Sequence, residues 1–257
     1  MMREIKSLQN EIVKRSAELK LKKYREATGT FFLEGKRAVE EALTADWHIE
    51  KLFCTEEYVQ EVQRSKLPEE SYLVDAKVMA KLAATENPQG VGAVVAIKKP
   101  VALQDFTLAQ GMVLVLDGVR DPGNVGTIIR TADAAGVQAV ILLEETADLY
   151  NPKVVRSTMG SLFHLPVFTG VGKTELIEWC RSKKVELWAT SLEGAENLFA
   201  TQWSTSTALV MGSEAEGVSQ ELLAAADKKV FIPMAGSAES LNVAVAAGIC
   251  MFCKKRL

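Results

Sequence analysis

The sequence predicts an α/β protein of two domains, the larger built on a parallel sheet with helices on both faces. Short apolar runs bounded by turn residues alternate with amphipathic stretches along almost the whole chain. In the second half these runs are continuous, as in residues 112–116 (MVLVL), which is typical of strands buried on both faces of a parallel sheet. The alternation is interrupted at residues 98–110, which carry no firm pattern.

This interruption sets the expected domain boundaries. We expect a small α/β domain at residues 1–97, a linker at 98–110 and a larger domain at 111–257. A chain of 257 residues, 48% hydrophobic and 25% charged, is typical of a globular protein. No apolar run approaches the ~20 residues of a membrane span, and no secretory apolar region follows Met1. We therefore expect a cytoplasmic protein with no membrane partner.

No metal site is expected. Cys250 and Cys253 form a CxxC pair, but the sequence has no second pair and only two histidines, His48 and His164. Structural zinc sites usually take their four ligands from two closely spaced pairs, and His48 and His164 do not form a second pair. We interpret the pair as two positions, three residues apart, in one apolar helix. The scattered cysteines also suit a reducing compartment.

The first domain begins with a basic segment. Residues 3–26 contain eight Lys and Arg against four Glu, a net charge of +4, which leaves −7 for the rest of the chain. A basic helical arm on an acidic body is an electrostatic pattern of nucleic-acid-binding proteins. A solvated helix face with balancing glutamates would have the same composition, so both interpretations stay open.

Strands and helices alternate through the rest of this domain. Residues 30–43 (TFFLEGKRAVEEAL) predict an apolar entry, a glycine and an amphipathic helix. Further strands are expected at 49–54, 71–74 and 91–97, and further helices at 56–65 and 77–83.

The second domain opens with a strand, a polar turn and a helix. The strand at 112–116 leads into a turn at 121–123 (DPG), after which Asn124 is placed to cap a helix running to Ala135. A strand at 138–143 completes a βαβ unit, whose turn lies where open parallel sheets bind ligands. Neither GxGxxG nor the P-loop GK[ST] is present. Arg130 lies off the apolar stripe of the helix. A plain cap also explains Asn124, and a surface ion pair with Asp133 also explains Arg130.

A similar turn follows a later strand. After a helix at 151–160, a strand at 165–168, a helix at 173–183 and a strand at 185–190, the strand at 207–211 runs into GSEAEG (212–217). Ser219 then caps a helix at 220–226, which places Glu214 at the same sheet edge as Arg130. Taken alone, this GxExxG pattern is also typical of an ordinary βα turn.

The last strand and helix flank a loop of small residues. Residues 228–233 predict a strand, and 235–240 (AGSAES) a loop that lets another molecule approach its backbone N–H groups. Ser240 or Asn242 caps a helix from Leu241 onward. Its small residues permit close packing, either on the sheet alone or against something else.

Three stretches together carry a family resemblance. NVGTIIRTADAAG, MGSEAEG and IPMAGSAESLNVAVAAG, in this order and spacing, resemble the signature motifs of the SpoU (TrmH-like) branch of the SPOUT RNA 2′-O-ribose methyltransferases. Residues 1–97 resemble the ribosomal-protein-like substrate-binding domain of those enzymes, with LEGKRAVEEAL as the recognisable part. The resemblance implies a catalytic SPOUT domain that binds S-adenosylmethionine and ends in a trefoil knot.

The resemblance also implies roles for single residues. Its catalytic set is Arg130, Asn124, Glu214, Ser240 and Asn242; cofactor contacts come from Gly212, Ile232 and Leu241; and RNA contacts come from Lys20, Lys22, Lys23, Arg25, Lys36 and Arg37. The sulfonium of the cofactor activates its methyl group without a metal, so the protein has to position a ribose 2′-hydroxyl and help it lose a proton. Arg130 either stabilises the developing alkoxide or accepts the proton with help from a substrate phosphate.

The expected partners are RNA and a second copy of the chain. Family members pair beside the knot, which implies a homodimer through the second domain. A folded N-terminal domain of this kind favours rRNA over tRNA as the substrate. A non-catalytic RNA-binding or ribosome-assembly protein that keeps only the fold is the alternative from another class, and the presence of Asn124 and Arg130 argues against it.

Overall fold

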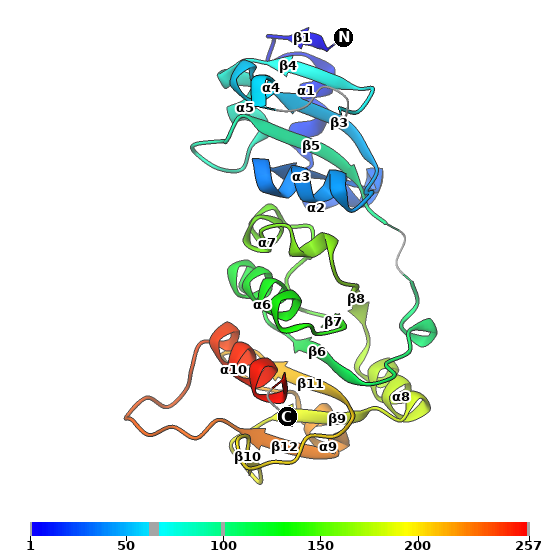
Figure 1. Ribbon diagram of the computed structural model, residues 1–257, viewed down its shortest axis with the longest axis vertical. Helices are drawn as coiled ribbons and strands as arrows, with labels where there is room; N and C mark the ends of the chain where they lie inside the picture. Colours follow the sequence, from blue (N-terminus) through cyan, green and yellow to red (C-terminus); the bar gives the residue numbers. More distant parts are fainter. Residues whose placement is uncertain (1, 62–66, 99–100, 256–257) are drawn as a thin grey trace. The chain divides into compact units, whose positions relative to one another are not determined.

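The computed structural model describes residues 2–61, 67–98 and 101–255 (Figure 1). Its contacts divide the chain into two compact units. The first unit combines the chain up to residue 98 with Asp148–His164, and the second combines residues 101–147 with the chain from Leu165 onward. Leu103 and Leu108 are buried in the core of the second unit, so residues 101–110 belong to that unit rather than to a free linker.

The first unit is built on a five-stranded sheet in the order β1-β4-β3-β5-β2. Its strands are β1 (Arg3–Ile5), β2 (Thr30–Glu34), β3 (Ile49–Cys54), β4 (Ser71–Val74) and β5 (Val91–Ala96). Its helices include α1 (Glu11–Glu18), α2 (Lys22–Thr28), α3 (Lys36–Thr44), α4 (Glu56–Glu61) and α5 (Ala76–Leu82). Strands β1, β4 and β3 run parallel, and β5 is antiparallel to its neighbours β3 and β2. The end of the helix predicted at 56–65 lies outside the described residues.

The basic segment is not the single helical arm that the sequence predicts. It begins with the edge strand β1 and continues as two short helices. The side chain of Asn10 accepts a hydrogen bond of 2.8 Å from the Ile12 N–H and so caps α1. Val13 and Leu19 are buried in the core of the unit together with Phe53 of β3. The segment is therefore an integral part of the domain, because its apolar side chains cover the sheet.

Residues Asp148–His164, called the inserted segment below, follow a strand of the second unit in the chain but pack in the first. The inserted segment contains helix α7 (Pro152–Ser157) and the 3-10 turn η3 (Ser161–Phe163). The ring centroids of Tyr150 and Phe31 lie 4.9 Å apart, and those of Phe163 and Trp47 lie 5.0 Å apart. The sequence predicts the helix but assigns the segment to the second domain, because helical periodicity does not indicate which core a helix joins.

The second unit is built on a seven-stranded sheet in the order β10-β12-β9-β11-β6-β7-β8. Its strands are β6 (Gly111–Asp117), β7 (Ala139–Leu143), β8 (Val167–Val171), β9 (Glu186–Thr190), β10 (Glu196–Asn197), β11 (Ser206–Gly212) and β12 (Lys228–Phe231). Its helices include η2 (Leu103–Asp105), α6 (Pro122–Ala135), α8 (Lys173–Lys183), α9 (Gln220–Ala225) and α10 (Val243–Lys255). All neighbouring strands are parallel, which confirms the predicted α/β class with a parallel sheet.

Helices cover both faces of this sheet. Val113 and Val115 of β6 are buried in a cluster with Trp179 of α8 and Leu222 of α9. Successive side chains of a strand point to opposite faces, so the intervening residues of β6 face the side of α6 and α10, which pack against each other (Figure 1). A Cβ atom on Gly248 of α10 would lie 3.5 Å from a methyl group of Thr131 of α6. Small residues in α10 therefore allow the close packing that the sequence predicts.

The trefoil knot implied by the resemblance stays a prediction. None of the helices in the described ranges has both the length and the apolar content needed to cross a membrane.

Candidate active site

Three of the predicted catalytic residues meet in one hydrogen-bonded chain. The amide nitrogen of Asn242 donates to the amide oxygen of Asn124 at 3.0 Å. The amide nitrogen of Asn124 in turn donates to a carboxylate oxygen of Glu214. Asn124 lies 90 positions before Glu214 and 118 positions before Asn242 in the sequence, and sheet topology explains why they meet. Strands β6, β11 and β12 are parallel members of one sheet, so the segments that follow them emerge at the same edge.

Asn124 lies in the first turn of α6. The helix begins at Pro122, and the side chain of Asp121 caps it by accepting a 2.8 Å hydrogen bond from the Asn124 N–H. The prediction that Asn124 caps the helix is therefore wrong, because Pro122 takes the first helical position and Asp121, three residues before Asn124, is the cap. Relieved of that role, the Asn124 side chain is available to bridge Glu214 and Asn242.

Glu214 is carried by a tight turn between Gly212 and Gly217. Ser213 and Gly217 exchange two backbone hydrogen bonds of 3.2 and 3.0 Å, and Gly217 has a left-handed backbone with φ of 69°. A Cβ atom on Gly212 would lie 2.0 Å from the carbonyl carbon of Gly217. Glycine is therefore needed at position 212 because the chain folds back on itself here.

Asn242 orients its amide by capping α10. Its side-chain oxygen accepts hydrogen bonds from the N–H groups of Ala244 at 2.9 Å and Val245 at 3.3 Å. Of the two predicted caps, Ser240 and Asn242, the structure selects Asn242. Because the oxygen is occupied, the amide nitrogen points toward Asn124, and the geometry of the polar chain is fixed from this side.

A cavity of about 650 Å³ adjoins the hydrogen-bonded residues Asn124, Glu214 and Asn242. It lies at the same sheet edge and is lined by Gly212, Ile232 and Leu241, the three residues predicted to contact the cofactor, and by Ser240. Its volume is within the usual range for small-molecule sites, and apolar side chains such as Leu192 and Met234 contribute to its wall. The apolar wall suits a flat aromatic base, and the backbone of the loops offers polar groups.

The cavity has an acidic lining. Four carboxylate residues, Glu193, Glu214, Glu216 and Glu239, line it, and among the described residues around it none is Lys, Arg or His. Such a lining suits a cationic sulfonium and disfavours a phosphate. Cys250 also lines the cavity, but burial raises the pKa of its thiol to about 12, so it remains protonated and is not a nucleophile at neutral pH.

Arg130 does not join this polar chain. It is exposed on α6, six residues after Asn124, and so about 9 Å along the helix axis and ~120° around it. It is absent from the described lining of the cavity. The structure therefore brings together Asn124, Glu214 and Asn242, places Ser240 beside them in the cavity wall, and leaves Arg130 on the outer face of the helix.

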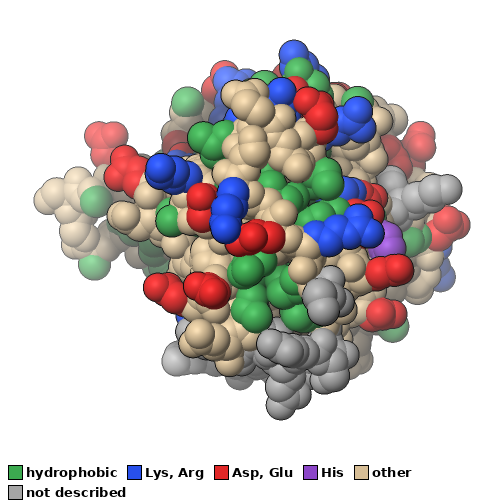
Figure 2. Space-filling model, turned by 90° about the horizontal axis from the view of Figure 1, so that it is seen from above, with side chains coloured by type: hydrophobic (Ala, Val, Ile, Leu, Met, Phe, Trp, Pro, Cys, Tyr) green, Lys and Arg blue, Asp and Glu red, His purple; other side chains and the backbone are tan. Residues whose placement is uncertain are grey.

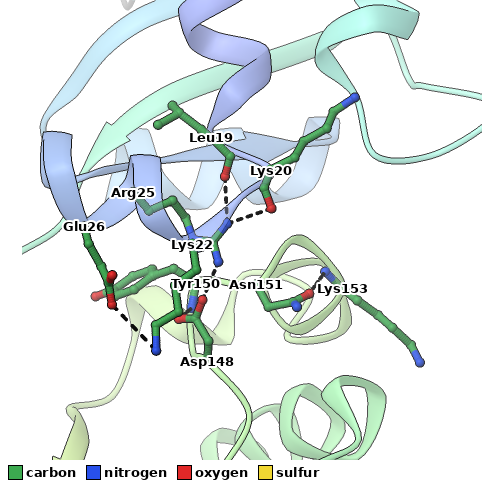
Figure 3. A network of polar contacts seen from close by, with 9 residues as sticks. All are labelled: Leu19, Lys20, Lys22, Arg25, Glu26, Asp148, Tyr150, Asn151 and Lys153. Carbon is green, nitrogen blue, oxygen red and sulfur yellow. Dashed lines mark hydrogen bonds and ion pairs between the residues drawn. The ribbon is translucent and has the colours of Figure 1, made fainter.

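The predicted RNA contacts divide into exposed and internal side chains. Arg25 is only 4% exposed, and its guanidinium donates to the backbone oxygens of Leu19 and Lys20 and forms an ion pair with Asp148 (Figure 3). Arg25 is thus not an RNA contact, because it holds the inserted segment instead. Lys20 is half-buried and donates to the Lys81 carbonyl at 2.8 Å.

The other predicted RNA contacts are more accessible. Lys22 and Lys23 are exposed, although Lys22 lies 3.6 Å from Glu26. Arg37 is exposed and lies 4.0 Å from Glu41, and Lys36 is half-buried. Lys and Arg are interspersed with Asp and Glu over the face shown in Figure 2. Net charge counted along the sequence therefore overstates how basic this surface is.

Sequence reasoning missed two acidic residues that support the site. Asp121 caps α6, as described above. Asp117, at the end of β6, is only 6% exposed and accepts a 2.8 Å hydrogen bond from the Ser219 N–H, which ties β6 to the turn that carries Glu214. The signal was present, since an Asp directly after a continuous apolar strand lies at the ligand-binding edge of a parallel sheet.

Comparisons with known proteins identify the family. The model of the SpoU rRNA Methylase family matches residues 111–252, and that of the MRM3-like substrate binding domain matches residues 10–93. The chain belongs to the SpoU rRNA methylase family. The resemblance carried by the three motifs is thereby confirmed, whereas the roles of single residues stay predictions.

SpoU relatives resemble the chain over its whole length. The 23S rRNA (guanosine(2553)-2′-O)-methyltransferase RlmP of Bacillus subtilis is 35% identical over 257 residues, covering 98% of each protein. The AdoMet-bound rRNA methyltransferase of Sinorhizobium meliloti superposes with a TM-score of 0.91 at 37% identity, covering 99% of this chain and 98% of that one. The SpoU methyltransferase AviRb of Streptomyces viridochromogenes, in complex with AdoMet, has a TM-score of 0.87 at 28% identity over 96% of this chain and 98% of its own.

Proposed function

We propose that this protein is an S-adenosylmethionine-dependent methyltransferase that modifies a ribose 2′-hydroxyl in rRNA. The observation that carries the proposal is the hydrogen-bonded series from Asn242 through Asn124 to Glu214. It lies beside an acidic cavity lined by Gly212 and Leu241. Polar groups that converge at the carboxyl edge of a parallel sheet, next to a cavity of ligand size, form a binding site for two reactants. Full-length relatives named for 2′-O-methylation of 23S rRNA support RNA ribose as the acceptor.

The cavity supplies the donor side of the reaction. S-adenosylmethionine provides a methyl group activated by its sulfonium, and the four carboxylates around the cavity favour that positive charge. Backbone groups of the loops that follow β11 and β12 would hold the cofactor, with Gly212, Ile232 and Leu241 in contact with it. Because no described cation lines the cavity, RNA phosphates are disfavoured there, and the ribose would enter only at the edge formed by the asparagines.

The asparagines supply the acceptor side. Each carboxamide nitrogen has two hydrogens, and the described bonds use one on Asn124 and one on Asn242. The remaining hydrogen on each can donate to a ribose hydroxyl. Glu214 orients Asn124 from one side, and the helix cap orients Asn242 from the other. The pair thus presents fixed donors, so little ordering is needed when the ribose binds.

Arg130 provides the charge at the acceptor oxygen in this proposal. A guanidinium is a poor base in water, so we assign Arg130 the stabilisation of the developing alkoxide. Proton acceptance assisted by a substrate phosphate is the alternative role. Because Arg130 is exposed on α6, it can serve either the site of its own protomer or that of a partner.

We infer that the protein is a homodimer through the second unit. On α10, Val245 and Phe252 are exposed at 52% and 45%, and Ile249 lies between them on the same face. This apolar stripe runs beside α6, the helix that carries Arg130. Pairing along it would bury the stripe and bring Arg130 close to the partner. Light scattering should give twice the mass of the 28.0 kDa chain, and a stable monomer at micromolar concentration would refute this inference.

The first unit is the RNA-binding part of the enzyme in this proposal. The first unit, in the region matched by the substrate-binding model, would hold RNA through exposed residues such as Lys22, Lys23 and Arg37. We place the enzyme in the cytoplasm, where rRNA is available.

Methyl transfer to in vitro transcribed 23S rRNA tests the function directly. Labelled S-adenosylmethionine, unmodified 23S rRNA and tRNA transcripts, and nucleotide mapping would identify the acceptor. We expect label on one ribose of 23S rRNA and none on tRNA. Cofactor binding without transfer to either RNA would favour the non-catalytic alternative, and transfer to tRNA alone would correct the substrate.

A further inference from the structure

The inserted segment has a buried inner face and a charged outer face. Val154, Val155 and Thr158 are buried against the first unit, whereas Lys153 and Arg156 are exposed. These two basic residues are three positions apart in α7 and therefore share one face of the helix. In Figure 3 the Lys153 side chain points away from the polar network around Arg25.

Directly after α7, Met159 has an unfavourable backbone. Its φ of 51° lies in the left-handed region, and its side chain is 40% exposed. Glycine adopts this conformation without steric cost, whereas a residue with a Cβ is strained. A side chain that is 40% exposed returns only part of its packing energy to the fold. Strain of this kind tends to accompany binding or switching sites, so Met159 is a second and independent indication of function in the same segment.

The segment is held firmly at both ends. The ion pair between Arg25 and Asp148, together with the contact of Tyr150 with Phe31, fixes its start, and the contact of Phe163 with Trp47 fixes its end. The outer side chains are therefore presented from a rigid backbone, which reduces the entropy lost when a partner binds.

The basic face continues onto the basic segment of the first domain. Arg156 and Lys20 line the same narrow hollow, together with the Glu34 side chain. The Glu34 carboxylate accepts hydrogen bonds from the Ala84 N–H and the Thr85 hydroxyl. Part of its charge is thus engaged internally, as is the Lys20 ammonium through the Lys81 carbonyl, whereas Arg156 stays exposed at the rim of the hollow.

We propose that the outer face of the inserted segment, formed by Lys153, Arg156 and Met159, is an RNA-binding surface of the enzyme. Lys153 and Arg156 contact phosphates, and Met159 packs against a base or ribose. This inference rests on the proposed function, because rRNA is the polyanion that the enzyme must hold. It assigns RNA contacts to residues that follow the first catalytic motif in the sequence but pack in the first unit.

Removing the two charges tests the phosphate contacts. We expect Lys153→Ala with Arg156→Ala to weaken binding to the 23S rRNA transcript about ten-fold at physiological salt and to reduce the slope of log K against log salt by about 1.4, at about 0.7 per phosphate for a single strand. Cofactor affinity should not change. The matched control is Arg181→Ala with Lys183→Ala on α8, which removes the same charge and should leave the slope unaltered.

Met159→Gly tests the apolar contact separately from folding. Glycine removes the backbone strain, so the melting temperature should stay the same or rise, while RNA affinity should fall several-fold. A purely structural role predicts no loss of affinity. If wild-type enzyme transfers methyl groups and both variants bind RNA like wild type, this inference is overturned and the face is only solvated. If wild-type enzyme transfers no methyl group to any RNA, the proposed function fails instead.

Discussion

The sheet edge of the second unit that carries the candidate site and the basic segment of the first unit differ in how far the sequence predicts their structure. At the edge, Asn124, Glu214 and Asn242 were predicted as a set, and the structure joins all three by hydrogen bonds. In the basic segment, Arg25 was predicted as an RNA contact but is buried. The set at the edge was implied by the family resemblance of the three motifs, whose turns follow strands of one parallel sheet. Charge counted along a helix does not indicate which side chains face solvent.

The largest expected effect sharpens the catalytic side of this comparison. Arg130 is exposed on α6, so Arg130→Ala should leave no cavity and cost little stability. If Arg130 stabilises charge on the 2′-oxygen, the barrier should rise by about 3–4 kcal/mol, a hundred-fold or greater loss in rate. Arg130→Lys should restore little, because an ammonium lacks the planar fork of the guanidinium. Single-turnover methyl transfer, measured beside cofactor titration, checks both variants.

Mixing experiments assign the protomer on which Arg130 acts. Neither Arg130→Ala nor Asn124→Ala should be active alone. If Arg130 reaches the partner's site, mixed dimers of the two variants regain one complete site and activity returns. If it acts within its own protomer, the mixture stays inactive. Near-normal transfer by Arg130→Ala alone would remove the catalytic assignment altogether.

The next effect concerns the buried cation of the basic segment. Arg25→Met leaves Asp148 without its partner, and breaking a buried ion pair of this kind should lower the free energy of unfolding by about 3 kcal/mol. Lys22→Met, three residues earlier and exposed, should change it by less than ~0.5 kcal/mol. Denaturant titration gives the free energy of unfolding of both variants, and hydrogen exchange in β2 and α7 shows whether the loss is local to the ion pair. Adding Asp148→Leu to Arg25→Met should recover part of the loss, and equal effects of the two single variants would contradict our account of the segment.

The sequence predicted the long buried strands of the fold, but neither its shortest strands nor the placement of the inserted segment. Continuous apolar runs such as residues 112–116 identified strands of the parallel sheet, because burial on both faces leaves no alternation. Strands β1 and β10, of three and two residues, are too short to show any period. The placement of Asp148–His164 in the first unit depends on Tyr150 and Phe163 finding aromatic partners more than 110 residues away in the chain. No local pattern contains that information.

The candidate site shows the same division. Motif positions predicted Gly212, Ile232 and Leu241 as neighbours of the cofactor, and all three line one cavity. The helix cap was assigned to Asn124 because both Asp and Asn are good caps, and only the observed bond to Asp121 decides between them. The acidic lining could not be predicted, because its carboxylates come from three separate loops that only the fold brings together.

A smaller effect concerns the exposed cations of the basic segment. Lys22→Ala with Lys23→Ala removes two side chains that the structure leaves accessible. If both contact phosphates, the salt dependence of RNA binding should fall by about 1.4 in slope, with the free energy of unfolding nearly unchanged. Filter binding to the 23S rRNA transcript over a salt series gives the slope, and exposed Lys77→Ala on α5 is the single-charge control. An unaltered slope would reduce this part of the segment to a solvated helix face.

The smallest effect comes from a cation that the second unit uses internally, as the first uses Arg25. Lys254 of α10 donates to the carbonyl oxygens of Gly111 and Ser204 and to the Thr207 hydroxyl, and burial lowers its pKa to about 8. The unfolded chain therefore holds this proton up to the ordinary lysine pKa of 10.5, whereas the folded chain releases it near 8. Stability rises with pH wherever the unfolded state binds more protons. The contribution of Lys254 should thus grow as pH rises from about 8 and be lost as pH falls back through 8. Denaturation at several pH values should show this rise in wild type but not in Lys254→Met, while the exposed-site control Lys77→Met behaves like wild type. Parallel pH profiles for wild type and Lys254→Met would show that the ammonium in the folded protein has an ordinary pKa, stabilised by its three oxygen partners.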